Sequence, residues 1–173
     1  MTYMAVVYRA DVAVVWLNGA FGVGKTTVAA ELARVLPGAR RVDPERIGFV
    51  MRRTFWRGVD YQDVALWRRM TSVNVSRVGR KATAIVPMTV TDIGVFDELT
   101  SGAQVFLLTA DRATLEHRIA GSLEGREWRS SQVDRCLGAF EGTQFGTPVS
   151  TVGRSPAEIA GEIADAVRQG AAC

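Results

Sequence analysis

The sequence has few of the residues that build metal centres and disulfide frameworks. It contains a single histidine, His117, and two cysteines, Cys136 and Cys173. The cysteines lie far apart, so neither a zinc-binding motif nor a disulfide scaffold is indicated. Cys136 shares helical spacing with apolar neighbours, which predicts a buried side chain, whereas His117 is expected on a helix surface.

Long uncharged apolar runs are also missing. The one long apolar segment, near the start of the chain, is interrupted by Arg9 and Asp11. These charges exclude a spanning helix and a signal peptide, so we expect a cytoplasmic protein without stable membrane insertion. Lysine occurs only as Lys25 and Lys81, so the net charge of +3 comes mainly from arginine. This modest excess, without a clustered basic face, does not indicate nucleic-acid binding.

The order of apolar runs predicts the class of fold. Runs typical of strands alternate with helical patterns, as in α/β proteins with a parallel sheet. The 61–81 segment is expected to be mostly helical, with Trp67, Met70 and Val78 on one stripe, and 121–131 is expected to be a flexible connection. The length of 173 residues suits one domain, residues 1–173. Strands are expected at 12–17, 41–43 (or a turn), 84–86, 105–108 and 149–152, and a final helix is expected with Ser155-Pro156 capping its start.

A glycine-rich stretch follows the first expected strand directly. Gly19, Gly24, Lys25 and Thr26 fit the phosphate-loop pattern G-x-x-x-x-G-K-[ST]. Glycines allow the backbone N–H groups to point at phosphate oxygens, and the helix that follows adds its positive end. Lys25 is expected to reach the β- and γ-phosphates, and Thr26 to bind Mg²⁺. The predicted nucleotide-binding residues are Gly19, Ala20, Phe21, Gly22, Val23, Gly24, Lys25, Thr26 and Thr27.

The rest of the chain favours a small kinase over other phosphate-loop proteins. It lacks the N-K-x-D guanine motif of GTPases, and motor and helicase domains are much larger. Four arginines, Arg118, Arg126, Arg129 and Arg135, lie in or near 121–131. They suit a lid, over about residues 121–131, that closes positive charge over a transferring phosphate. The alternative is that some of them are solvated surface residues.

The expected third strand lacks the acid that often helps to hold Mg²⁺. Its sequence, Ala84-Ile-Val-Pro-Met-Thr89, ends in threonine. Asp92 and Asp111 each precede an expected helix and suit an N-cap. The acid must then come from elsewhere in the chain.

Several motifs together resemble the tunicamycin-resistance ATP-binding proteins. The resemblance covers roughly residues 12–165. It implies a three-layer P-loop fold like that of nucleoside and shikimate kinases, near the chloramphenicol phosphotransferases. The expected sheet is five-stranded and parallel, in the order 2-3-1-4-5, with helices on both faces and a short lid. The matching motifs are N-G-A-F-G-x-G-K-T at 18–26, D-P-E-x-x-G-F at 43–49, L-W-R at 66–68, V-P-M-T at 86–89, E-G at 124–125, Trp128 and D-R-C at 134–136.

The resemblance also implies roles for individual residues. Related kinases place an aspartate that contacts the substrate hydroxyl where Asp43 stands, so Asp43 is the expected base or substrate ligand. Helix capping stays open for Asp43, and Glu45 is a second choice. Lys25 and Arg118 complete the expected catalytic set. The acceptor side is expected to include Arg46, Trp67, Arg68 and Thr89, although Trp67 suits the core equally and Thr89 could instead contact Mg²⁺ through water.

Two functions of different classes follow from these expectations. The first is an ATP- and Mg²⁺-dependent phosphotransferase acting on a hydroxyl of a small nucleoside-like molecule or antibiotic. The second is a protein that uses ATP to capture tunicamycin without modifying it. A housekeeping nucleotide or metabolite kinase is a third reading. Tunicamycin carries a uridine unit, so an acceptor pocket of the nucleotide-kinase type suits it under either of the first two.

Overall fold

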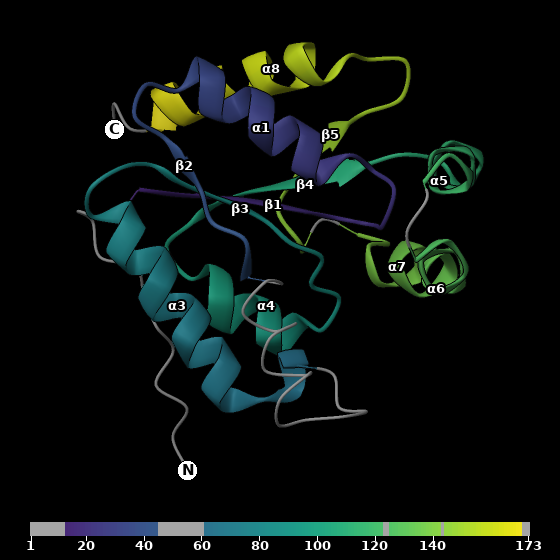
Figure 1. Cartoon of the computed structure of the whole chain (residues 1–173), viewed down its shortest axis with the longest axis horizontal. Coiled ribbons are helices and arrows are strands. Elements are labelled where there is room, and N and C mark those ends of the chain that lie inside the picture. Colours follow the sequence, from purple (N-terminus) through teal and green to yellow (C-terminus); the bar gives the residue numbers. More distant parts are fainter. Residues whose placement is uncertain (1–12, 45–60, 123–124, 143, 171–173) are drawn as a thin grey trace.

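The computed structural model describes residues 13–44, 61–122, 125–142 and 144–170. Five parallel strands form one sheet in the order β2-β3-β1-β4-β5, as the resemblance implied (Figure 1). Because β1 lies in the centre, the loop that follows it emerges in the middle of the sheet's carboxyl edge. The strands are β1 Val14–Gly19, β2 Arg40–Arg41, β3 Ala84–Pro87, β4 Gln104–Thr109 and β5 Thr147–Ser150.

Helices cover both faces of the sheet. Helices α1 (Lys25–Val35) and α8 (Pro156–Gly170) lie on one face, and α3 (Ala65–Gly79) and α4 (Ile93–Thr100) on the other (Figure 1). A 3₁₀ helix, η1 (Tyr61–Asp63), precedes α3. Three short helices lie together at one side, α5 Arg112–Ala120, α6 Arg126–Ser131 and α7 Val133–Ala139.

The central strand supplies side chains to two hydrophobic cores. Leu17 packs in the core beneath α1 and α8, whereas Trp16 packs in the core beneath α3 and α4. Successive side chains of a strand point to opposite faces, so a strand covered on both faces is apolar throughout. All six residues of β1 are buried. This burial fixes the strand that carries the phosphate loop.

Some expected boundaries and faces are wrong. Residues 126–131 form α6 instead of a connection, and the last strand begins two residues earlier than expected, at Thr147. Met70 is not on the buried face of α3, because its side chain is 43% exposed. Trp67 and Val78 of the expected stripe do pack in the core beneath α3. The buried face of α3 also contains polar residues, among them Arg68, which apolar spacing did not identify.

Other local expectations are confirmed. Cys136 is buried, and His117 lies exposed on α5. Ser155 caps α8: its hydroxyl accepts from the Glu158 amide, and its own amide donates to the Glu158 carboxylate. This reciprocal pair is a capping box. Within the described part of the chain, every helix is too short or too polar to cross a bilayer.

Candidate phosphate-binding site

The loop between β1 and α1 requires glycine at two positions, because of both the backbone conformation and the lack of space for a Cβ. Gly19 has φ +140°, and a Cβ there would lie 2.5 Å from the Leu108 carbonyl oxygen of β4. Gly22 has φ +83°, and its Cβ would lie 2.8 Å from Ile119 Cγ1 on α5. Both backbone conformations are unfavourable for residues with a side chain. The loop is therefore pressed against β4 and α5, and other residues would displace it.

Lys25 spans this loop. Its Nζ donates hydrogen bonds to the carbonyl oxygens of Gly19 and Ala20, each 2.9 Å long. The ammonium group also lies 5.4 Å from the centre of the Phe21 ring. Lys25 is the first residue of α1, so its charge adds to the positive end of that helix. The positive charge of Lys25 and the N-terminus of α1 therefore lie together at the loop.

Asn18 joins the start of the loop to the chain after β3. Its Oδ1 accepts from the amides of Gly19 and Val90, both at 2.9 Å, and its Nδ2 donates to the Val90 carbonyl oxygen at 3.0 Å. The side chain is completely buried, at 0% exposure. A buried amide with its groups satisfied fixes the relative position of two strand ends.

Thr89 stands where an acid was sought. Its hydroxyl donates to the Gly19 carbonyl oxygen at 2.9 Å, and the residue is buried. In this structure the V-P-M-T segment anchors the phosphate loop. Contact of Thr89 with an acceptor or with metal-bound water stays a prediction.

The two exposed threonines and Asp43 border the site. Thr26 and Thr27 are exposed in the first turn of α1, and Asp43 is exposed two residues beyond the end of β2. The strands β2, β3 and β1 are neighbours and parallel, so Asp43, Thr89 and the phosphate loop lie at the same edge of the sheet. Ligands of open α/β sheets bind at this edge.

Arg118 of α5 is attached to the loop. It donates to the Val23 carbonyl oxygen at 3.1 Å, to Thr151 Oγ1 at 3.0 Å and to the Thr151 carbonyl oxygen at 2.9 Å. Thr151 is buried, and its hydroxyl donates to the Thr109 carbonyl oxygen. The predicted catalytic arginine therefore lies beside the phosphate loop, fixed to the ends of β4 and β5.

The three predicted lid arginines donate hydrogen bonds to other residues of the protein. Arg126 donates to the Ser122 carbonyl oxygen, and Arg129 donates to the Ser122 hydroxyl at 3.0 Å. Arg135 donates to Thr91 Oγ1 at 3.0 Å, which links α7 to the segment after β3. Whether they reach a bound phosphate stays a prediction.

An aromatic contact joins α6 to the phosphate loop. The rings of Phe21 and Trp128 meet edge to face with their centres 4.9 Å apart, and Trp128 remains 55% exposed. Such pairs contribute about 0.5–1.5 kcal/mol beyond the buried area. The expected lid segment thus contacts the loop through a tryptophan, which sequence reasoning identified only as a family match.

Two of the expected acceptor-side residues, Trp67 and Arg68, are buried and have partners within the protein. Trp67 is completely buried, and its Nε1 donates to the Pro44 carbonyl oxygen at 3.3 Å, so it packs in the core beside the chain that follows Asp43. Arg68 is also buried and pairs with Glu98 on α4. Arg46 and Glu45 lie outside the described residues.

The two other candidate acids cap helices, as expected. Asp92 accepts from the Val95 amide and Asp111 from the Thr114 amide, so each caps a helix, α4 and α5 respectively. The Thr114 amide, aided by its hydroxyl, lowers the pKa of Asp111. In these contacts each carboxylate binds an amide of its own helix.

The family model of the AAA domain matches residues 14–142. The chain belongs to this family. It is a P-loop nucleotide-binding, kinase-like protein, as the motifs indicated. No curated protein matches the sequence.

Solved structures agree with the family. The tunicamycin resistance protein of Deinococcus radiodurans shares 28% identity with this chain over 90% of it and 95% of that protein, with a TM-score of 0.73. A gluconokinase from Sinorhizobium meliloti 1021 is 14% identical over 95% of this chain and 96% of that one, with a TM-score of 0.63. A shikimate kinase from Acinetobacter baumannii is 15% identical over 92% and 94%, with a TM-score of 0.61. The last two are alike in fold.

Sequence reasoning missed four residues of the AAA domain's loop surroundings. Two of them bond the chain after β3: Asn18 bonds Val90, and Gln62 bonds the Thr89 carbonyl oxygen. The other two bind arginines: Glu98 pairs with Arg68, and Thr151 accepts from Arg118. Asn18 was visible within the family motif but had no expected role. The other three are distant in sequence from the loop, and no local pattern marks them.

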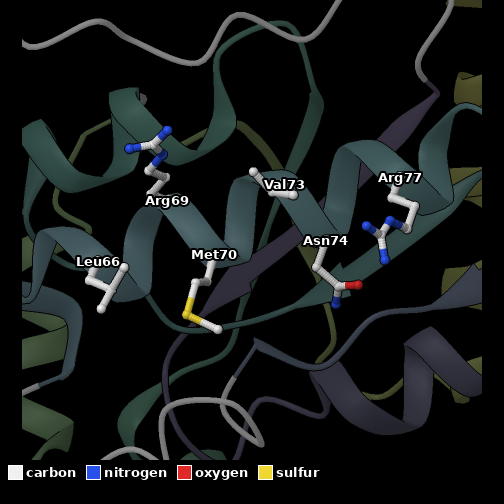
Figure 2. Close-up of a pocket in the computed structure, with 6 residues that line it drawn as sticks. All are labelled: Leu66, Arg69, Met70, Val73, Asn74 and Arg77. Carbon is white, nitrogen blue, oxygen red and sulfur yellow. The ribbon is translucent and has the colours of Figure 1, made fainter.

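A hollow on α3 is separate from this site. It is lined by Leu66, Arg69, Met70, Val73, Asn74 and Arg77, all on the outer side of the helix (Figure 2). Arg68 and the other buried residues of α3 lie on the opposite side, against the sheet. Helix α3 therefore presents one face to solvent, and its other face supports the phosphate site.

Proposed function

We propose that this protein is an ATP- and Mg²⁺-dependent phosphotransferase that acts on a hydroxyl of a small nucleoside-like molecule, with tunicamycin as the first candidate. The observation that carries the proposal is the position of Asp43 at the same sheet edge as the loop spanned by Lys25. A carboxylate there can accept a hydroxyl proton next to a bound γ-phosphate. The likeness to the tunicamycin resistance protein supports this acceptor class.

The proposed reaction uses few groups of the protein. The acceptor hydroxyl loses its proton to Asp43, its oxygen bonds to the γ-phosphorus of ATP, and the bond to the β-phosphate oxygen breaks to leave ADP. Lys25 and Arg118 neutralise the charge on the transferring group, because phosphoryl transfer depends mainly on position and electrostatics. Phosphate oxygens would compete with the carbonyl oxygens that both side chains now contact.

The residues at the site fit Mg²⁺. Thr26 places a hydroxyl in the exposed first turn of α1. The described residues contain no group of three or more His, Cys, Asp or Glu able to hold a metal alone. Mg²⁺ suits such a site because it keeps several waters and takes phosphate oxygens as ligands. Thr26 would hold the ion, which shields the phosphate charges when bound.

The test is direct incubation of the protein with ATP, Mg²⁺ and tunicamycin, followed by mass spectrometry of the drug. We expect a mass gain of one phosphate, with an equal amount of ADP. Lys25→Met should abolish it. An unchanged mass despite ATP-dependent binding of the drug would overturn the phosphotransferase proposal for this acceptor. Uridine and other nucleosides in the same assay test the wider acceptor class.

The alternative is ATP-dependent capture of tunicamycin without modification. The Deinococcus radiodurans protein, 28% identical to this chain, is a tunicamycin resistance protein, and resistance needs only removal of the drug. This function predicts stoichiometric binding, no ADP and no mass change. Either function is proposed to operate in the cytoplasm, where ATP and Mg²⁺ are available. A housekeeping metabolite kinase would instead ignore tunicamycin and phosphorylate another small alcohol.

A further inference from the structure

A chain of hydrogen bonds runs from a partly buried ion pair between α3 and α4 to Lys25. It begins with Arg68 of α3, whose Nε donates to Glu98 Oε2 on α4 at 2.8 Å. Another nitrogen of the same guanidinium, Nη1, donates to the Gln62 carbonyl oxygen in η1 at 2.8 Å. One planar side chain thus ties two helices to the short η1 turn.

The chain continues from η1 to the phosphate loop. The Gln62 side chain donates through Nε2 to the Thr89 carbonyl oxygen at 3.1 Å. The Thr89 hydroxyl donates to the Gly19 carbonyl oxygen at 2.9 Å. That same oxygen accepts from Lys25 Nζ at 2.9 Å. Thr89 and the lysine ammonium therefore share one anchor.

Burial makes this arrangement specific. Arg68 is only 8% exposed, and a charge buried this far needs a partner. Glu98 supplies that partner. The rigid fork of a guanidinium can hold the carboxylate and a carbonyl oxygen at once, which a lysine ammonium does less well. Arg68 is one of the buried residues of α3 and does not line the solvent-facing hollow.

We propose that Arg68 and Gln62 are positioning residues of the phosphate loop. They set the position of Thr89, and through it the Gly19 carbonyl oxygen that holds the Lys25 ammonium. The strength with which the loop binds phosphate then depends on η1, and phosphate binding in turn stabilises η1. Movement of η1 during acceptor binding would therefore alter phosphate affinity. The inference rests on nucleotide binding by the proposed function and does not require phosphoryl transfer.

The first test measures the affinity of the folded protein for pyrophosphate with Mg²⁺, a probe of the loop alone, by calorimetry. Gln62→Met removes the donor to Thr89 and keeps the side-chain length. We expect roughly three- to tenfold weaker binding, the effect of one lost hydrogen bond. Gln104→Met is the matched control, because Gln104 is the first residue of β4 and lies at the end of the strands opposite to the phosphate loop. This variant should bind pyrophosphate as the wild type does. Equal affinities for the two variants would overturn the proposal.

A double-mutant cycle separates positioning from general destabilisation. Thr89→Val removes the hydroxyl that reaches Gly19, and Thr89→Ser retains it. We expect Thr89→Ser to bind pyrophosphate nearly as tightly as the wild type. We also expect the Gln62→Met/Thr89→Val double variant to be little weaker than Thr89→Val alone. If the two losses instead multiply, the residues act independently and the chain of hydrogen bonds does not transmit the effect.

A measurement on the unaltered protein covers the case in which variants fail to fold. Hydrogen exchange should slow on adding pyrophosphate both in the loop and in the segment 62–72. Protection confined to the loop and α1 would overturn the proposed coupling. These outcomes are independent of whether any acceptor is phosphorylated, so failure of phosphoryl transfer leaves the inference intact. If the wild type and Gln62→Met bind pyrophosphate equally well, this inference is contradicted, and the proposed function is not.

Discussion

The Thr89 hydroxyl donates a hydrogen bond of 2.9 Å to the carbonyl oxygen of Gly19, a residue 70 positions earlier in the chain. This contact joins the end of β3 to the first glycine of the phosphate loop. At the position where an acid was sought after the third strand, the structure thus has a side chain that holds the loop. The loop is consequently fixed from both sides, by Thr89 and Asn18 on one and by Arg118 on the other.

Replacing Asn18 by alanine should destabilise the fold strongly. The change leaves the buried amides of Gly19 and Val90 and the Val90 carbonyl without their partner. We expect a loss of about 2–4 kcal/mol in the free energy of unfolding, measured in urea. Asn74→Ala, in the outer hollow of α3, is the control. It should change stability by less than about 0.5 kcal/mol, since alanine favours a helix. Equal losses would show that Asn18 does not hold the strand ends.

Lys25→Met should abolish nucleotide binding without unfolding the protein. The lysine Nζ contacts two loop carbonyl oxygens, and methionine keeps its packing beside Phe21 but not its charge. We expect affinity for ATP to fall at least about a hundredfold, because charge-assisted hydrogen bonds to phosphate are strong. Calorimetry of Lys81→Met, which changes the other lysine in the chain, should match the wild type. Retained ATP affinity in Lys25→Met would contradict the site.

Asp43→Asn should separate binding from chemistry. The amide cannot accept the hydroxyl proton, so transfer should fall by about 10²–10⁴-fold while ATP affinity stays within about threefold. The measurements are ADP release and equilibrium binding. Asp97→Asn, an exposed aspartate on α4, is the matched control and should keep full activity. Lost ATP affinity in Asp43→Asn would make Asp43 a structural or metal residue.

The capping box of α8 should make stability depend on pH. The Ser155 hydroxyl and amide donate to Glu158 and lower the pKa of its carboxyl below its ordinary value of 4.5. A lowered folded-state pKa contributes stability above the unfolded value, which is lost as the pH falls through the folded value. Glu158→Gln should therefore melt below the wild type at pH 7, with the gap closing below about pH 4.5. Glu141→Gln, in an exposed turn, should show the wild-type pH dependence.

Cys136 should react slowly with alkylating reagents. Burial raises the pKa of the Cys136 thiol, although the Phe21 amide and the charges of Lys25 and Arg135 act in the opposite direction. The thiolate, which is the reactive form, is therefore scarce at neutral pH. Peptide mass spectrometry after iodoacetamide treatment at pH 7.5 should find Cys136 unmodified in the native protein and modified in denaturant. Rapid native labelling would show that α7 opens readily.

The sequence by itself determined the features that obey local rules. The glycines of 19–24 predicted a tight loop, and Lys25 at the start of a helix predicted a phosphate site. Asp92, Asp111 and Ser155 predicted helix starts, because capping involves residues only a few positions apart. The order of strands followed from the family resemblance, and the structure has the same order.

Only the tertiary structure decided which distant residues meet. Helical spacing placed Met70 inside, yet the structure buries Arg68 instead, because Glu98 and the Gln62 carbonyl oxygen compensate its charge. Thr89 reaches Gly19 because β3 and β1 are neighbours in the sheet, although 70 residues separate them. Contacts of this kind depend on how strands and helices pack and leave no periodic pattern in the chain. The sequence therefore located the phosphate loop, and the packing of the strands and helices around it decided which residues hold it.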